Sequence, residues 1–163
     1  MEPIPEELVE ETWQEFAGFS RVGIQKETVK VNKNQPNLVA FMMEFTQDLD
    51  QEVRELALYM SYVICRMFQK SSKKGLKRIS PEEIISYYEK TERLIESLEG
   101  TDEKFLERIA EVQLSGQPYV MKYVLETLME APEEEEPIAL TEEDIGYLFL
   151  LFKTLVDVID KNT

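Results

Sequence analysis

Two segments of this chain are apolar on more than one helical face, and this feature most constrains the fold. In residues 52–69 the apolar positions are Val53, Leu56, Ala57, Met60, Val63, Ile64 and Met67. In residues 142–160 they are Ile145, Leu148, Phe149, Phe152, Leu155, Val156 and Ile159. A helix that is apolar on nearly every side is normally buried inside a bundle or at a contact between subunits. We therefore predict an all-α fold with these two segments as its central helices.

Helix-start signals divide the rest of the chain into further helices. Pro5, Pro36 and Pro118 each stand where a first helical residue accepts proline, and Ser80 precedes a proline and a capping-box glutamate. Residues 20–35 are ambiguous, because valines there alternate with polar residues as in a short extended segment. In the first helix, Val9, Trp13 and Phe16 follow helical spacing. The pattern predicts a helical bundle of about six or seven helices, covering residues 6–19, 36–49, 52–69, 81–98, 101–112, 118–128 and 142–160.

The order of these helices repeats within the chain. Residues 35–44 begin with Gln-Pro and resemble residues 117–126, which begin in the same way, and the two central segments align behind them. The additional residues of the second half include the glutamate-rich stretch Pro132–Pro137, and insertions are tolerated in loops. The helix over 6–19 then corresponds to the helix over 81–98.

This repeat has two interpretations. Any two amphipathic helices align at their apolar positions, so similarity of this kind also arises without duplication. A duplication predicts a single domain, residues 1–163, built from units 6–69 and 81–160 about a pseudo-two-fold axis, with a polar linker at 70–80. In that arrangement the two central helices contact each other.

Missing residue types exclude several kinds of site. The chain has no histidine and one cysteine, so it contains no Ser-His-Asp triad, no histidine metal site and no intrachain disulfide. It also lacks a Gly-rich phosphate-binding sequence. Cys65 lies inside an apolar segment, which predicts a buried and unreactive thiol. We therefore predict no catalytic residues, no metal site and no cofactor.

The overall charge limits the partners of this chain. A net charge of −15 opposes binding to nucleic acid, which requires neutralisation of phosphates by lysine and arginine. The first residues show neither the basic nor the apolar region of a signal peptide, and the apolar stretches are too short to span a bilayer. We therefore expect a cytoplasmic protein with no membrane and no nucleic-acid partner.

The distribution of charge is more informative than its total. Residues 1–15 and 123–152 contain acids and no base. Residues 56–81 contain bases and no acid. We call this group the basic island: Arg66, Lys70, Lys73, Lys74, Lys77 and Arg78. It suits a phosphate, an acidic partner or an acidic surface of a second copy; the alternative is a solvated linker that keeps a surface loop soluble.

Carboxylate pairs on helices are the only plausible catalytic material. Glu52 and Glu55 are three residues apart, whereas Glu92 with Glu96, and Glu107 with Glu111, are four apart. Such pairs share a helix face and are able to hold Mg²⁺. However, about one fifth of the chain is acidic, so solvated helix faces explain these pairs better than a motif does.

Two classes of function follow from these observations. The leading hypothesis is a non-enzymatic protein–protein interaction or assembly module that binds a protein partner or forms a homo-oligomer. The alternative is a Mg²⁺-dependent all-α hydrolase of a phosphorylated small molecule, in which helical carboxylates hold the metal and the basic island attracts phosphate. The alternative requires at least three carboxylates that converge in one pocket.

Overall fold

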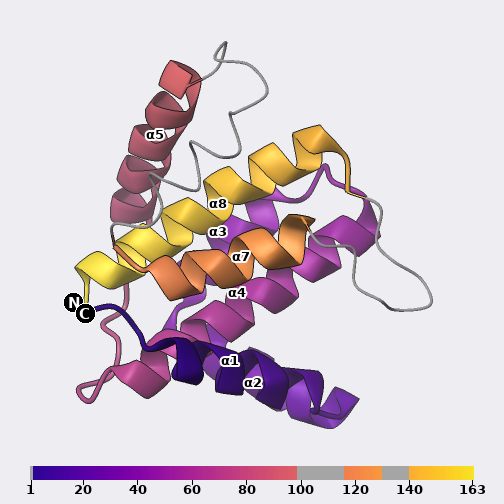
Figure 1. The fold of residues 1–163 in the computed structure, drawn as a ribbon, viewed down its shortest axis with the longest axis vertical. Helices are drawn as coiled ribbons and strands as arrows, with labels where there is room; N and C mark the ends of the chain where they lie inside the picture. Colours follow the sequence, from indigo (N-terminus) through magenta and orange to yellow (C-terminus); the bar gives the residue numbers. More distant parts are fainter. Residues whose placement is uncertain (1, 99–115, 130–139) are drawn as a thin grey trace.

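A computed structural model describes residues 2–98, 116–129 and 140–163 of this chain. Every regular element in these ranges is a helix, so the predicted all-α fold is confirmed. The predicted helix over 101–112, which includes Glu107 and Glu111, lies outside the described residues. The helices, shown in Figure 1, are α1 (Glu6–Ala17), α2 (Arg21–Asn34), α3 (Pro36–Phe45), α4 (Gln51–Ser71), α5 (Pro81–Leu98), α7 (Pro118–Met129) and α8 (Glu142–Lys161).

Local capping explains where several of these helices begin. At α8, the Thr141 hydroxyl accepts from the backbone N–H of Asp144 at 3.0 Å, and the Asp144 carboxylate accepts from the backbone N–H of Thr141 at 3.2 Å. At α5, the Ser80 hydroxyl accepts from the backbone N–H of Glu83. These side chains satisfy backbone donors that have no partner within the helix. The predicted starts of both helices are confirmed.

The ambiguous residues 20–35 form α2, so the extended alternative is wrong. The Ser20 hydroxyl caps the helix by accepting from the backbone N–H of Gly23. Along α2 only Glu27 and Val31 are fully buried, while Val22 and Val29 are exposed. Helix α2 buries a glutamate and exposes two valines. Its sequence therefore lacks the continuous apolar stripe by which an amphipathic helix is recognised.

Helices α4 and α8 form the centre of the described fold. They pack against each other, and α8 also contacts α3, α5 and α7, while α4 also contacts α1, α2, α3 and α7. The predicted contact between the two central helices is therefore confirmed. Their shared core contains side chains that are almost entirely buried, among them Met60, Val63, Ile64, Met67, Phe149, Phe152, Leu155, Val156 and Ile159.

The two glutamines that precede proline make matching long-range contacts. Gln35 accepts from the backbone N–H of Ile79 at 3.1 Å and donates to the backbone carbonyl of Lys77 at 2.7 Å. Gln117 accepts from the backbone N–H of Ile4 at 2.9 Å and donates to the backbone carbonyl of Glu2 at 3.3 Å. We call each pair of hydrogen bonds a glutamine clasp. Each clasp fixes the stretch that leads into the first helix of the other unit.

Helix contacts follow the same reciprocal pattern. Helix α1 packs on α7, and α5 packs on α3. The first helix of each proposed unit therefore contacts the helix of the other unit that follows its Gln-Pro start. Helix α3 contacts α8, and α7 contacts α4. Two halves related by a pseudo-two-fold axis would make these contacts. The duplication itself stays a prediction, and the reciprocal contacts and clasps are the observations in its favour.

The linker between the proposed units is less free than its polar sequence suggests. Ile79 is buried in the core, and Asn37 donates to its backbone carbonyl at 2.9 Å. Gly75 has a φ of 73°, a left-handed conformation that a residue with a Cβ rarely adopts. The chain therefore turns sharply at Gly75 and is fixed again within four residues.

No helix in the described ranges is both long and apolar enough to cross a membrane.

Candidate interaction surface

The structure divides the basic island into two parts. Lys70 forms an ion pair with the carboxylate of Glu15 on α1, and the guanidinium of Arg78 donates to the backbone carbonyl of Lys33 at 3.1 Å. Arg66 is half-buried on α4, and its Nε has no hydrogen-bond partner among the described residues. Lys70 and Arg66 are partly buried against the body of the molecule, whereas Arg78 is exposed and is tied to α2 by this hydrogen bond.

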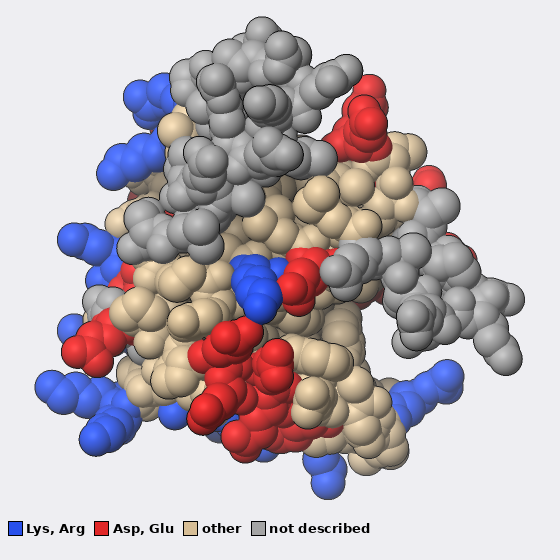
Figure 2. Space-filling view, viewed as in Figure 1, with Lys and Arg blue, Asp and Glu red and all other residues tan. Residues whose placement is uncertain are grey.

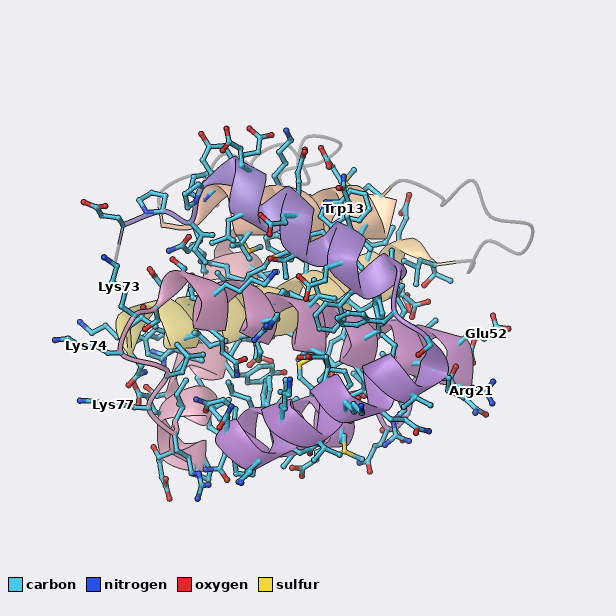
Figure 3. The ribbon with its side chains drawn as sticks, turned by 90° about the horizontal axis from the view of Figure 1, so that it is seen from below. Trp13, Arg21, Glu52, Lys73, Lys74 and Lys77 are labelled. Atoms are coloured by element: carbon cyan, nitrogen blue, oxygen red, sulfur yellow. The ribbon has the colours of Figure 1, made fainter. Side chains whose placement is uncertain are left out.

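The other three bases form an exposed lysine loop. Lys73, Lys74 and Lys77 are exposed and have no ion pair among the described residues. Figure 3 shows all three side chains pointing outward from one end of the molecule. We call residues 72–78 the lysine loop. Because the Gln35 clasp holds the backbone at Lys77, the ammonium groups are carried by an anchored segment.

Helix α1 carries a continuous acidic outer face. Its inner face consists of Val9, Thr12 and Phe16, and most of the other positions are glutamates without any base. Glu7, Glu10 and Glu11 are exposed, and Figure 2 shows acidic side chains gathered over the position of α1 in Figure 1. The outer face of α1 is therefore strongly negative.

Lysines from other helices already bind the edges of this face. Lys122 on α7 forms an ion pair with Glu6 at 2.8 Å, and Lys70 on α4 pairs with Glu15. The hydrogen bond to the Glu6 carboxylate raises the pKa of Lys122 above its usual value. Two carboxylates of α1, Glu6 and Glu15, are thus paired with lysines of other helices.

A large aromatic side chain lies at the border between this acidic face and the buried face of α1. Trp13 is 38% exposed, and Figure 3 shows it on α1. The sequence pattern placed Trp13 on the same face as Val9 and Phe16, but Thr12 occupies the buried position instead. The spacing of Val9, Thr12 and Phe16 is equally helical, and the hydroxyl of Thr12 is satisfied by the Leu8 carbonyl at 2.7 Å. Periodicity alone did not distinguish the two faces, so the exposure of Trp13 was missed.

The carboxylate pairs are not brought together into one site. Glu52 and Glu55 are exposed on α4, and Glu55 accepts a hydrogen bond from Gln51 at 3.1 Å. Glu92 accepts from the hydroxyl of Tyr88 at 3.1 Å, and Glu96 is exposed. Among the described residues, no three carboxylate or thiol groups lie close enough to hold a metal ion.

The remaining candidate groups have structural roles. Cys65 is 1% exposed on α4, and burial raises the pKa of its thiol to about 12, so the predicted buried thiol is confirmed. Tyr88 packs edge-on against Phe45, with ring centroids 4.8 Å apart. An open groove on the outside of α5 is lined by Pro81, Ile85 and neighbouring polar residues. This groove is open to solvent and resembles an ordinary surface hollow.

Comparisons with known proteins identify no relative of this chain. No protein-family model, no curated protein and no solved structure matches this chain.

Proposed function

We propose that this chain is a non-enzymatic interaction module and that the outer face of α1 is its binding surface. The observation that carries the proposal is the exposure of Trp13 at the border of the acidic face of α1, one helical turn from Glu10. Tryptophan is enriched at the centres of protein interfaces, where it contributes large contact area. The surrounding carboxylates would select a basic partner and accelerate its association.

The hydrolase alternative receives less support from the fold. It needs three converging carboxylates, whereas Glu52, Glu55 and Glu96 are directed separately to solvent. The basic island also shows no enclosed phosphate site among the described residues, because four of its members are exposed and only Arg66 and Lys70 are partly buried. No observation among the described residues favours this second function.

Affinity capture with matched variants tests the proposal. One variant combines Glu7→Lys, Glu10→Lys, Glu11→Lys and Trp13→Ala. The control combines Glu44→Lys, Glu89→Lys, Glu96→Lys and Met43→Ala, which make the same types of change at exposed positions on α3 and α5. Circular dichroism and thermal unfolding establish that both variants remain folded.

We expect the control to retain the protein bound by the unaltered chain and the α1 variant to lose it. Equal retention by both variants would place the binding surface elsewhere. The absence of any bound protein, with the unaltered chain monomeric at every concentration, would contradict the function itself.

A further inference from the structure

Two unpaired surfaces of opposite charge lie at the same end of the molecule. Figures 1 and 3 both show the loop after α4 and the beginning of α1 toward the same end of the molecule. The lysine loop carries Lys73, Lys74 and Lys77, and the outer face of α1 carries Glu7, Glu10 and Glu11. All six residues are exposed. None of these groups forms an ion pair within the described part of the chain.

Within one chain these two surfaces form no ion pair with each other. The Gln35 clasp and the buried Ile79 fix the end of the lysine loop, while α1 is held on α4 and α7. These contacts fix the backbone of both segments in the arrangement without such ion pairs. The three ammonium groups and the three carboxylates therefore remain available to another molecule.

We propose that the partner of the α1 face is a second copy of this chain, whose lysine loop lies across Glu7, Glu10, Glu11 and Trp13. This inference rests on the proposed function and identifies its partner. Ion pairs form between the three lysines and the three glutamates, and a lysine ammonium over the Trp13 indole adds a cation–π contact. The internal pairs Lys70–Glu15 and Lys122–Glu6 are the same chemistry within one chain.

The position of the two surfaces favours a symmetric dimer. When a loop and its complementary helix lie at the same end of a protein, a two-fold axis allows each copy to give its loop and receive the other. Each contact is then made twice. An interface dominated by exposed charge weakens with salt, because the screening length falls from about 10 Å at 0.1 M to about 3 Å at 1 M.

Complementary charge reversal provides a sharp test of this pairing. One variant carries Lys73→Glu, Lys74→Glu and Lys77→Glu, and the other carries Glu7→Lys, Glu10→Lys and Glu11→Lys. Each variant alone places like charges at both contacts, whereas a mixture restores opposite charges at both. Controls are Arg21→Glu, Lys26→Glu and Lys33→Glu on α2, and Glu44→Lys, Glu89→Lys and Glu96→Lys, all at exposed positions.

Sedimentation equilibrium at low and high salt supplies the measurement. We expect the unaltered chain and both controls to dimerise, each reversal variant to dimerise about 100-fold more weakly, and the mixture to recover the affinity. A monomeric unaltered chain, or a mixture that does not recover, would overturn this inference. If affinity capture still finds a different protein that depends on the α1 face, the proposed function survives and only the second copy is wrong as its partner.

Discussion

Burial on α4 controls the chemistry of the single cysteine. Because the surroundings of Cys65 raise the pKa of its thiol to about 12, almost no reactive thiolate exists near neutral pH. We expect a thiol-specific reagent to label the folded protein extremely slowly and to label it fully in denaturant. Absorbance of the released chromophore measures both rates. Rapid labelling of the folded chain would show that Cys65 is accessible.

Ionisation of Tyr88 should lower the free energy of unfolding at alkaline pH. Burial, followed by the hydrogen bond to Glu92, raises the pKa of Tyr88 from 10.0 to about 12. The folded state therefore favours the protonated phenol, and this stabilisation is present below about pH 10 and is lost as the pH rises toward about pH 12. Denaturant unfolding at about pH 9 and about pH 11.5 measures the loss, which Tyr88→Phe should reduce. An equal loss in that variant would assign the effect to other groups.

The glutamine clasps give a prediction about single side chains. Gln117→Leu leaves the backbone N–H of Ile4 and the carbonyl of Glu2 without this partner, and we expect the free energy of unfolding to fall by about 1–3 kcal/mol. Gln35→Leu should have a similar effect at Ile79 and Lys77. The exposed Gln25→Leu is the control, with an expected change within about 0.5 kcal/mol. Chemical denaturation measures all three, and equal effects would contradict the role of the clasps.

At the scale of single elements, α2 should open before the central helices. Its inner face buries only Glu27 and Val31 fully, and one carboxylate oxygen of Glu27 is buried without a hydrogen-bond partner among the described residues. Such a group destabilises the contact that buries it. We expect hydrogen exchange, measured by mass spectrometry, to be faster over residues 24–33 than over residues 60–68.

A substitution at Glu27 extends this prediction. Glu27→Met removes the buried carboxylate, so exchange in α2 should become slower, whereas Gln25→Met on the exposed side should change it little. Faster exchange in Glu27→Met would mean that the carboxylate stabilises α2. In that case the ion pair between Glu27 and Lys30, at 3.3 Å, would stabilise α2 by more than burial of the carboxylate destabilises it.

Some helices were predictable from the sequence, whereas others were predicted only in part or not at all. The start of α8 was predictable because Thr141 and Asp144 form a capping box from adjacent residues. The helical state of α2 was not, because a helix that buries a glutamate and exposes Val22 and Val29 has a weak apolar pattern. For α1 the helix was predicted correctly, but the choice between Thr12 and Trp13 at the buried face depended on tertiary packing.

At the candidate surface the charged residues were predictable from the sequence, whereas their partners were not. The basic island was apparent from composition, yet nothing local indicated that Lys70 pairs with a glutamate 55 positions away. The shared Gln-Pro start was the only signal for the clasps, because a buried glutamine acquires its role from a remote backbone segment. The contact between α4 and α8 was predictable because two helices apolar on several faces need each other for burial.

At the scale of the whole molecule, the two proposed units should assemble from separate chains. A break between Lys74 and Gly75 falls in the exposed turn, and both clasps join the resulting fragments, residues 1–74 and 75–163. The large contact between α4 and α8 also joins them. We expect co-expressed fragments to purify together in equal amounts with the helical circular dichroism of the intact chain.

The clasps supply the control for this experiment. Fragments that carry Gln35→Leu and Gln117→Leu should associate more weakly than unaltered fragments, because both contacts across the break are lost. Fragments that fold separately and do not associate would contradict the reciprocal arrangement of the units.

Synthesis from the N-terminus limits when each of the two reciprocal clasps can close. Gln35 and Ile79 are 44 residues apart, so both partners of this clasp exist while much of the chain is still to be made. Glu2 and Ile4 are made first, but their partner Gln117 follows more than one hundred residues later. The beginning of α1 is therefore among the first parts of this protein to be synthesised and among the last to be fastened.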